Sequence, residues 1–526
     1  MHTHLAAPWA KVSLQKETLI VVFYLISDAS DLLEMTKFKT LSLSVVLACL
    51  PFAVSAADIE KINTDVVVVG SGGTGLSAAA SAHQHGAKVL LIEKQAFVGG
   101  SSALAGGAIA AGNTNPQKRA GTQNVSDDGF VNIWIKDQDR SFPGADESMP
   151  DEARMHKIIN EFDKTVNWME KDIGHKFAVP RPFGYGGPNY AHAPAESPIP
   201  ASGRGSSPAG GRFVVKAFTT YLDNAGVPIM TGTKAEELIT DSKGNVVGVK
   251  AMKGKQPIEI RAKAVILGTG GFARNKELLE KFVPSYAPYT DVSNATPGAT
   301  GDGIIMAQKV GAAGFKDGWV MGISPVSTKR ELNNTFRTKN VYKDDVFVNQ
   351  DGKRFVKEDL PYIVDPIANQ KAAWAILDSK DTNKAALLAK YNDPEIVVSG
   401  KNWEELAKAM GVPAAQLKAT MDQYNQACKD KKDPVFDKNP EFLVPFEQAP
   451  FYAVRVIPST MGTIGGVRTN DKFQVLRADG SVIKGLYAGG ETANRPFYRR
   501  VYTSGTGLGL AYTSGRIAGE NAAQEK

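Results

Sequence analysis

The sequence predicts an α/β protein, and three observations lead to this fold class. Residues 64–94 read as an apolar strand, a glycine turn, a helix of small residues and a second strand. Two further apolar strands, within residues 262–275 and 484–494, also end in glycine turns. The chain is also long: 526 residues with 43% hydrophobic content can bury the cores of two domains. We therefore expect a Rossmann-like domain to whose sheet the later strands return, in a chain long enough for two domains.

Composition excludes several classes of protein. The chain has 61 Lys and Arg against 55 Asp and Glu, and its net charge of +6 is spread without a basic block, so we expect no nucleic acid partner. Cys49 and Cys428 are the only cysteines, which excludes a disulfide framework and a cysteine–histidine metal cluster. No C-x-x-C-H motif occurs, so the chain attaches no c-type haem. We predict no metal site.

Residues 1–56 read as an export leader whose natural start is Met35. Lys37 and Lys39 precede an apolar run, and a small-residue cleavage site ends at Ala56. The segment before Met35 is either a longer leader or an upstream misread start, and its apolar stretch is too short to span a bilayer. We therefore expect a periplasmic protein with no integral membrane segment in the mature chain.

The first glycine turn has the spacing of a dinucleotide-binding motif. Gly70 is expected to make a tight turn, Gly72 to let the backbone approach a pyrophosphate, and Gly75 to let the helix pack closely on the sheet. The helix N-terminus then faces the phosphates. Glu93, which ends the second strand, is placed to accept hydrogen bonds from ribose hydroxyls. The predicted cofactor contacts of this unit are Gly70, Gly72, Gly73, Gly75, Glu93 and Lys94.

A stretch of small residues follows the acidic residue. The segment VGGSSALAGGAIAAG, residues 98–112, allows the close backbone contact that the extended body of FAD requires, whereas a nicotinamide enzyme would not need it. We therefore expect FAD as the cofactor. The predicted contacts of this segment are Gly99, Gly100, Ser101, Gly106 and Gly107.

Two later segments are expected to return the chain to the same sheet. The strand within residues 262–275 and the strand within residues 484–494 both lead into glycine turns. The closing helix begins near Thr506, and its positive N-terminal end is expected to point toward the flavin pyrimidine and stabilise negative charge on a reduced flavin. The predicted contacts are Gly268, Gly270, Gly490, Glu491, Thr506, Gly507 and Leu508.

Together these motifs resemble the FAD-dependent fumarate reductase and succinate dehydrogenase flavoprotein superfamily, in particular the flavin subunits of the flavocytochrome c type. Further shared segments are PGATGDGIIMAQKVGA, VNQDGKRFVKE and GTIGGV, the first of which contains Asp302, a further predicted cofactor contact. The resemblance implies non-covalent FAD bound by residues 57–290 and 455–526. It also implies that this FAD-binding domain is built from a discontinuous chain, with an inserted α+β capping domain, residues 291–454, that closes over the flavin.

Three departures from the fumarate reductases point to a different substrate. Tyr362 stands where the resemblance places their proton-donating arginine, and Gly462 where they have a histidine that holds a substrate carboxylate. Residues 499–502 replace their asparagine–arginine pair. Fumarate, which needs two carboxylate clamps, is thus a poor fit. Residues 357–365 and Tyr502 are instead similar to the segments of 3-ketosteroid dehydrogenases that carry functional tyrosines.

Our hypothesis is a reductase for the conjugated C=C of a small α,β-unsaturated carboxylate or enone other than fumarate. Reduced FAD delivers hydride from N5 to the β-carbon, and Tyr362, neutral at its usual pKa of about 10, protonates the α-carbon. Arg499 or Arg500 binds the carboxylate or carbonyl oxygen and stabilises the developing enolate, and Tyr502 adds a hydrogen bond. The plainer interpretation is a packed aromatic residue for Tyr362 and a solvated loop pair for the two arginines.

The sequence alone leaves the direction and even the presence of catalysis open. The enzyme could work in the oxidative direction as a dehydrogenase of the ketosteroid type, or the chain could be a flavin carrier without activity. Tyr185, Tyr190 and His192 lie in a long loop rich in Gly and Pro that either lines the substrate pocket or covers a surface. No second nucleotide-binding unit is apparent, so we expect a separate multihaem cytochrome c as electron donor, with anaerobic respiration as the setting. Substrate identity and oligomeric state are not readable.

Overall fold

The computed structural model describes residues 59–122, 126–141, 149–182, 188–197, 210–322, 324–336, 342–360, 363–500 and 502–525. The chain divides into two units, Met1–Ala56 and Ala57–Lys526, and all described residues belong to the second. The predictions on the leader, on Tyr185 and on Tyr362 therefore lie outside the described residues. None of the helices in the described ranges combines the length and apolar character needed to cross a membrane.

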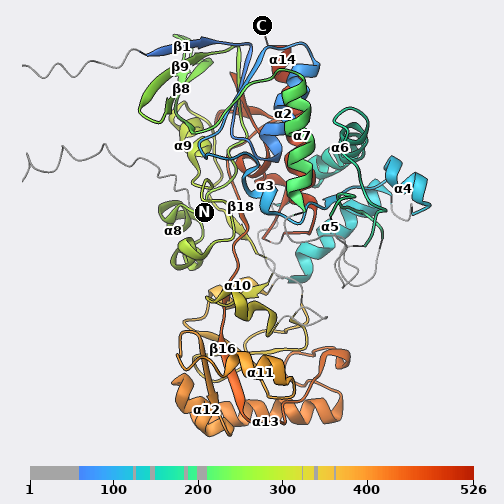
Figure 1. Ribbon diagram of the computed structural model, residues 1–526, viewed down its shortest axis with the longest axis vertical. Helices are drawn as coiled ribbons and strands as arrows, with labels where there is room; N and C mark the ends of the chain where they lie inside the picture. The colour runs from blue at the N-terminus through green and yellow to red at the C-terminus, as the bar shows by residue number, and fades with distance from the viewer. Residues whose placement is uncertain are drawn as a thin grey trace, which may run out of the picture. The chain divides into compact units, whose positions relative to one another are not determined.

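A six-stranded sheet lies within the upper part of the second unit as drawn in Figure 1, and segments far apart in the sequence supply its strands. The strand order is β19-β20-β10-β2-β3-β6, and every neighbouring pair is parallel except β19 with β20. This confirms the predicted α/β class and the return of both later glycine segments to the first sheet. The strands are β2 (Val66–Val69), β3 (Val89–Ile92), β6 (Ile229–Met230), β10 (Ala264–Leu267), β19 (Gln474–Leu476) and β20 (Val482–Ala488).

Layers cover both faces of this sheet, which explains why β2 and β10 read as unbroken apolar runs. Successive side chains of a strand point to opposite faces, so Val66 and Val68 join one core while Val67 and Val69 join the other. The first core packs against helices that include α2 (Gly73–Gln84), α6 (Glu152–Lys171), α7 (Gly211–Asn224) and α14 (Thr506–Ala523). The second packs against a four-stranded sheet and α9 (Asp302–Lys309). That sheet has the order β1-β9-β8-β7, formed by β1 (Glu60–Asn63), β7 (Thr233–Thr240), β8 (Val246–Lys253) and β9 (Gln256–Arg261).

Small residues bring the closing helix α14 onto α2, and Figure 1 draws the two helices side by side. A Cβ at Gly515 would lie 2.1 Å from the Ser77 Oγ, and one at Gly519 would lie 2.3 Å from the Ala78 carbonyl oxygen. Both distances are shorter than any van der Waals contact, so neither position accepts a side chain in this packing. The first face also carries α3 (Gly100–Leu104), α4 (Asn115–Ala120), α5 (Asp127–Ser141), β4 (Ile109–Ala110) and β5 (Ala191–His192).

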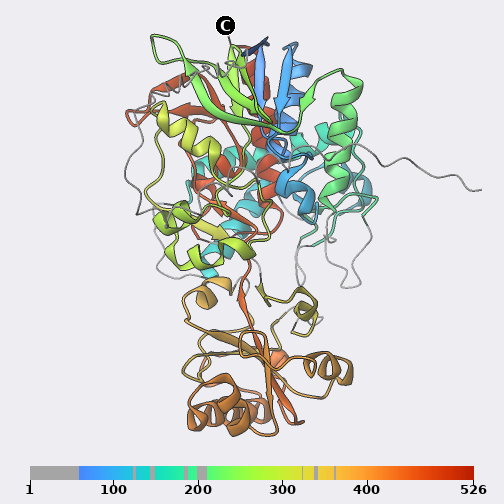
Figure 2. The same ribbon diagram turned by 60° about the vertical axis from the view of Figure 1, so that its left-hand side comes forward.

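A second α+β body lies between β10 and β20 in the sequence, and Figure 2 shows it as a sheet with its own helices. Its antiparallel strands have the order β13-β14-β16-β15. These strands and helices follow β10 and precede β20 in the sequence, and their identity as an inserted domain, its limits and its action as a cap stay predictions. Its elements are β13 (Val346–Asn349), β14 (Ala373–Leu377), β15 (Val397–Gly400), β16 (Phe451–Arg455), α10 (Val364–Ala368), α11 (Thr382–Leu388), α12 (Trp403–Met410), α13 (Ala414–Asp430) and the 3₁₀ helix η3 (Pro440–Phe442).

Two short antiparallel pairs join this body to the six-stranded sheet. Strand β11 pairs with β18, and β12 pairs with β17. The chain therefore leaves and returns through neighbouring strands. These strands are β11 (Trp319–Met321), β12 (Pro325–Val326), β17 (Ile457–Pro458) and β18 (Gly462–Ile464). The remaining elements near the junction are α8 (Lys276–Phe282) and the 3₁₀ helices η1 (Pro284–Val292), η2 (Arg330–Asn334), η4 (Gly490–Thr492) and η5 (Arg495–Phe497).

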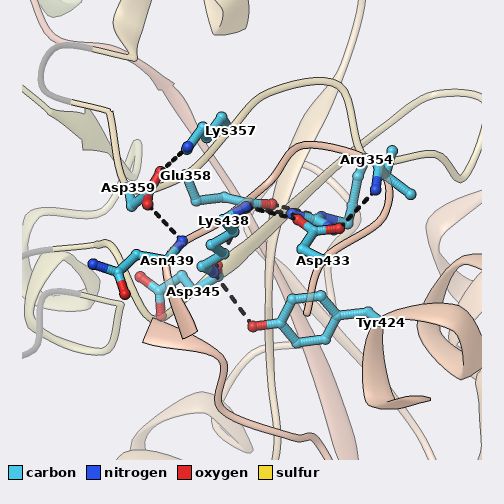
Figure 3. Close-up of polar contacts among 10 residues, drawn as sticks. Asp345, Arg354, Lys357, Glu358, Asp359, Tyr424, Asp433, Lys438 and Asn439 are labelled. Atoms are coloured by element: carbon cyan, nitrogen blue, oxygen red, sulfur yellow. Dashed lines mark hydrogen bonds and ion pairs between the residues drawn. The ribbon is translucent and has the colours of Figure 1, made fainter. Parts of the chain in front are cut away.

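A buried cluster of charges holds together the part of the inserted body that precedes α10 (Figure 3). The Arg354 guanidinium donates to both carboxylate oxygens of Glu358, at 2.9 and 2.7 Å, and to Asp433 at 2.8 Å. The Lys438 ammonium lies 3.5 Å from the same Glu358 carboxylate. The side chains of Glu358, Asp433 and Lys438 are fully buried. Buried charges of this kind persist because each one has a partner, so the chain is fixed at Glu358.

Candidate functional site

A cavity of about 1110 Å³ opens at the carboxyl ends of the parallel strands. Its walls include the last residues of β2 and β3, Gly268 directly after β10, and Gly490 shortly after β20. This edge is where open α/β sheets bind ligands. Of the predicted cofactor contacts, those that line the cavity are Gly70, Gly72, Gly73, Glu93, Lys94, Gly100, Ser101, Gly106, Gly107, Gly268, Gly270, Asp302, Gly490, Glu491, Gly507 and Leu508.

The three glycines of the first turn have different geometry. Gly70 has a φ of +96°, and a Cβ there would lie 2.6 Å from the Gly268 carbonyl oxygen. A Cβ at Gly75, which does not line the cavity, would lie 1.7 Å from the Gly70 carbonyl oxygen. At Gly72 a Cβ would meet nothing closer than 4.0 Å, and this residue lines the cavity. Gly70 and Gly75 thus allow β2, β10 and α2 to approach one another closely. Gly72 has no such packing role, and a side chain there would extend into the cavity.

The acidic and basic residues after β3 already have partners. Glu93 accepts hydrogen bonds from the Ser71 N–H and hydroxyl, at 2.8 and 2.7 Å, and from the Gln95 N–H at 2.8 Å. The Lys94 ammonium donates to Asp302 at 2.8 Å and to the Thr300 hydroxyl at 2.6 Å. A carboxylate has about four acceptor sites, so Glu93 keeps capacity for a further donor. Sequence reasoning missed Ser71 and Thr300, because a hydroxyl side chain next to a glycine motif carries no signal of its own.

Two structural causes account for the small residues at 98–112. Part of the segment lines the cavity, and another part meets the start of α7. A Cβ at Gly107 would lie 2.6 Å from the Gly211 nitrogen, and a Cβ at Gly99, which does not line the cavity, would lie 2.8 Å from the Ala103 Cβ. The Ser101 hydroxyl accepts from the Thr296 N–H at 3.1 Å and so joins this segment to residues before α9.

Glu491 closes the cavity at the end of β20. Its carboxylate accepts from the Thr463 N–H at 2.9 Å, and burial raises its pKa to about 7. A Cβ at Gly462 would lie 2.6 Å from this carboxylate, and one at Gly271 would lie 2.5 Å from it. The glycine that stands in place of the expected histidine at 462 therefore makes room for Glu491.

The start of α14 brings aromatic residues to the cavity. The Tyr502 hydroxyl accepts from the Gly505 N–H at 3.1 Å, and Tyr502 and Tyr498 both line the cavity. Burial raises the pKa of Tyr502, so the phenol stays protonated at neutral pH. Thr506 does not line the cavity, since its hydroxyl donates to the Thr503 carbonyl oxygen at 2.6 Å and lies 2.9 Å from the Tyr498 hydroxyl.

The predicted substrate-binding arginines do not line the cavity. Arg499 donates through Nε to the Met149 carbonyl oxygen at 2.8 Å. The Arg500 guanidinium lies 4.7 Å from the centre of the Trp319 ring, a cation–π contact. The structure thus brings Tyr502 to the cavity and places Arg499 and Arg500 outside its wall.

Behind this wall lies a buried carboxylate that sequence reasoning missed. Asp365 accepts from the Tyr286 hydroxyl and, at 2.7 Å, from the Trp319 indole N–H. Burial raises the pKa of Asp365 to about 7, although both hydrogen bonds and the charge of Arg500 act in the opposite direction. Tyr286 and Trp319 come from η1 and β11, so Asp365 ties α10 to the junction beside the cavity.

The described residues of the Gly- and Pro-rich loop are structural. His192 is fully buried and bonds to the Thr114 hydroxyl at 2.7 Å. Burial lowers its pKa to about 4, so the ring is neutral at pH 7. Tyr190 packs on Phe130 with 4.9 Å between ring centroids. Neither Tyr190 nor His192 lines the cavity.

One end of the cavity is polar, and the sequence did not suggest it. This end is formed where β12 and β17 pair. Its residues carry hydroxyl, amide and guanidinium groups, whereas the end beside the six-stranded sheet is lined by glycines. We call the end at β12 and β17 the polar end, and define it by Ser324, Ser327, Thr328, Arg330, Asn333 and Ser459.

The FAD binding domain family matches residues 65–508 of the chain. A fumarate reductase (cytochrome) of Shewanella frigidimarina is 31% identical over 472 residues, which cover 88% of this chain and 77% of the relative. A urocanate reductase of Eggerthella lenta is 30% identical over 88% of this chain and 75% of its own length. The solved structure of a 3-ketosteroid-Δ4-(5α)-dehydrogenase from Rhodococcus jostii RHA1 superposes with a TM-score of 0.67 at 27% identity, covering 90% of this chain and 98% of that one.

The cavity fits FAD on the geometry of its own residues. Glycines line the carboxyl ends of β2, β10 and β20, so an extended ligand can lie against backbone there. Helix α2 begins at Gly73, next to Gly72 on the cavity wall, and its first turn offers backbone N–H groups to a pyrophosphate. FAD is the cofactor that the family of this chain binds, and the cavity has the geometry to hold it.

A matched pair of glycine variants separates cofactor binding from folding. We expect Gly72→Val to fold normally and to bind FAD at least tenfold more weakly, because the added atoms occupy only cavity space. Gly75→Ala should instead lower the unfolding temperature of the apoprotein, because its Cβ meets the Gly70 carbonyl. Flavin absorbance after purification and thermal unfolding without cofactor measure the two effects. Wild-type FAD affinity in Gly72→Val would contradict this assignment of the cavity.

Proposed function

Because the chain belongs to the FAD binding domain family, within the fumarate reductase and succinate dehydrogenase flavoprotein superfamily, we propose that it reduces the conjugated C=C of a small α,β-unsaturated carboxylate or enone. It is an FAD-dependent oxidoreductase acting on CH–CH bonds. One observation carries the proposal of substrate: the same cavity is lined by the glycines at the strand ends, by the residues of the polar end, and by Tyr498 and Tyr502. Bound FAD in its reduced form supplies the hydride for such a reduction.

The substrate we propose is not fumarate. A dicarboxylate needs a clamp at each end, and none of the described residues that line the cavity is a histidine. At position 462 a side chain would collide with Glu491. A single polar anchor suits acrylate-like acids, aryl-acrylates and enones. The similarity to a urocanate reductase supports a reductase whose substrate is other than fumarate.

We propose Tyr362 as the group that protonates the α-carbon, although it lies outside the described residues. Its support comes from the flanking residues on both sides. Glu358 is held by Arg354 and Lys438 in the inserted body, and Asp365 is held by Tyr286 and Trp319 at the junction. Buried, paired residues on either side of Tyr362 in the sequence suit the position of a proton donor.

Tyr502, which lines the cavity, would hydrogen-bond the substrate carbonyl in this proposal. Arg500 would act from behind the wall, where Trp319 holds it and where its charge favours an ionised Asp365. Arg499 would position the neighbouring backbone through its bond to Met149. We further propose that residues 57–290 and 455–526 hold FAD, and that residues 291–454 close over it as a cap.

The proposed setting is the periplasm, with a separate multihaem cytochrome c as the electron donor in anaerobic respiration. The leader pattern before Ala57 supports export. A relative whose name includes a cytochrome supports the donor class. An exported flavoenzyme must receive electrons from a carrier outside the cytoplasm, and a c-type cytochrome meets that need.

An anaerobic screen tests the proposed reaction. We expect acrylate, cinnamate or an enone to reoxidise the enzyme with reduced methyl viologen as donor, and fumarate to do so at least tenfold more slowly. The absorbance of the viologen radical measures turnover. A reduced c-type cytochrome in place of viologen then tests the donor. The proposed reductase activity is refuted if no unsaturated acid or enone reoxidises the flavin. The proposed substrate class is refuted if fumarate is the best acceptor.

The Tyr362→Phe variant tests the proton donor. We expect FAD to stay bound and kcat to fall by about 10²–10⁴-fold, the usual contribution of a positioned general acid. Tyr391→Phe is the matched control, since the Tyr391 hydroxyl bonds to exposed Glu331 and lines no part of the cavity. Undiminished turnover in Tyr362→Phe removes this residue as the acid.

The ionisation of Asp365 should appear in the pH dependence of kcat. Its pKa is raised to about 7, so the carboxylate that accepts from Tyr286 and Trp319 forms fully only above that pH. We expect wild-type kcat to rise with pH through about 7, and Asp365→Asn to lack this limb. Trp319→Phe keeps a ring beneath Arg500 but removes a hydrogen bond that lowers the pKa of Asp365. In this variant the rise of kcat should therefore shift to higher pH. An unchanged limb in Asp365→Asn would exclude this role.

A further inference from the structure

Two positive side chains line the cavity within the described part of the chain, Lys94 and Arg330. They differ in their partners. Lys94 is neutralised by Asp302 at 2.8 Å, and its ammonium also donates to Thr300. Arg330 forms no ion pair with a described residue, and its side chain is exposed on the cavity wall. An unpaired guanidinium facing a ligand cavity is a ready partner for an anion.

A fixed turn holds the backbone of Arg330. The Ser327 N–H donates to the Asn333 side-chain oxygen at 2.7 Å, and the Ser327 hydroxyl accepts from the Lys329 N–H at 3.2 Å. Leu332 in η2 is fully buried. The guanidinium therefore extends from a rigid base, which lowers the entropy lost when it binds a ligand.

The acidic residues on the same cavity wall do not supply the missing anion. In the described ranges these residues are Glu93, Asp302 and Glu491. Glu93 and Asp302 are bonded to Ser71 and Lys94, at the end of the cavity that follows β3. Glu491 accepts from the Thr463 N–H, and burial raises its pKa to about 7 because it disfavours the charged carboxylate. An anion that pairs with Arg330 inside the cavity would therefore come from the ligand.

We propose that Arg330 binds the carboxylate of the substrate. The planar guanidinium matches a carboxylate with two parallel hydrogen bonds, and Ser327 and Thr328 line the cavity wall beside it. Arg330 then takes the role that the sequence assigned to Arg499 or Arg500. Because no second unpaired cation lines the described cavity wall, the substrate class is an unsaturated monocarboxylate. This assignment rests on the proposed reductase function and narrows it.

The test compares acids with neutral analogues of the same shape. Wild-type enzyme, Arg330→Gln and Arg330→Lys are assayed on cinnamate against cinnamamide and on acrylate against acrylamide, with reduced methyl viologen as donor. For Arg330→Gln we expect the KM for both acids to rise at least tenfold and the KM for the amides to change less than twofold. Arg330→Lys should fall between, because a single ammonium retains the charge but loses the paired geometry. The KM of wild type for the acids should also rise with ionic strength.

Lys329→Gln is the matched control, because Lys329 is the exposed neighbour on the same turn and does not line the cavity. We expect it to leave KM for acids unchanged, so an equal effect of both variants would reduce Arg330 to a general surface charge. The inference is also overturned if Arg330→Gln raises KM for acids and amides alike, or if the wild type accepts enones and no acid. The last result leaves the reductase intact, whereas reoxidation by neither class refutes the reductase itself.

Discussion

The close approach of three backbones at Gly70, Gly75 and Gly268 is the constraint on which the site depends. The Gly70 carbonyl oxygen occupies the space of a Gly75 Cβ, and the Gly268 carbonyl oxygen occupies that of a Gly70 Cβ. These contacts let β2 and β10 end side by side and let α2 begin close to their carboxyl ends. The N-terminus of α2 thereby faces the cavity. Any side chain here would separate strand from helix and displace the phosphate end of the site.

The position of the polar end follows from the order of the strands. Strand β20 pairs with β10, yet the whole inserted body lies between them in the sequence. The chain must leave the six-stranded sheet after β10 and return to it before β20. It does so through two antiparallel pairs, β11 with β18 and β12 with β17. These pairs bring Met321, Ser324, Ser459 and Met461 to the cavity. The polar end is therefore a consequence of the insertion, and it joins the cofactor site to the body that carries Glu358 and Asp365.

The sequence could predict what depends on the local backbone and could not predict what depends on distant partners. A glycine directly after an apolar strand indicates a tight turn or a close backbone approach. The positions of Gly70, Gly268 and Gly490 at the cavity could therefore be predicted from the sequence. Arg500 was predicted to bind the substrate because it is a cation near a functional tyrosine. Its guanidinium instead packs on the ring of Trp319, which belongs to the distant strand β11. Asp365 reads as an ordinary acidic residue in a helix until its burial is known. Arg330 reads as part of a solvated Thr-Lys-Arg turn, and only the cavity distinguishes it from Lys329.

The charges around the cavity are arranged so that an anion meets little repulsion. Glu93 and Asp302 are offset by hydrogen bonds and by Lys94, whereas Glu491 and Asp365 lie where burial raises the pKa of each to about 7. The last two acids are therefore only partly ionised at neutral pH, and Glu491 alone of these two touches the cavity. A full complement of negative charge there would oppose a carboxylate through a medium of low polarity. Because the acids are either paired or partly neutral, the one unpaired guanidinium among the described lining residues sets the sign of the potential that a small ligand meets at the polar end.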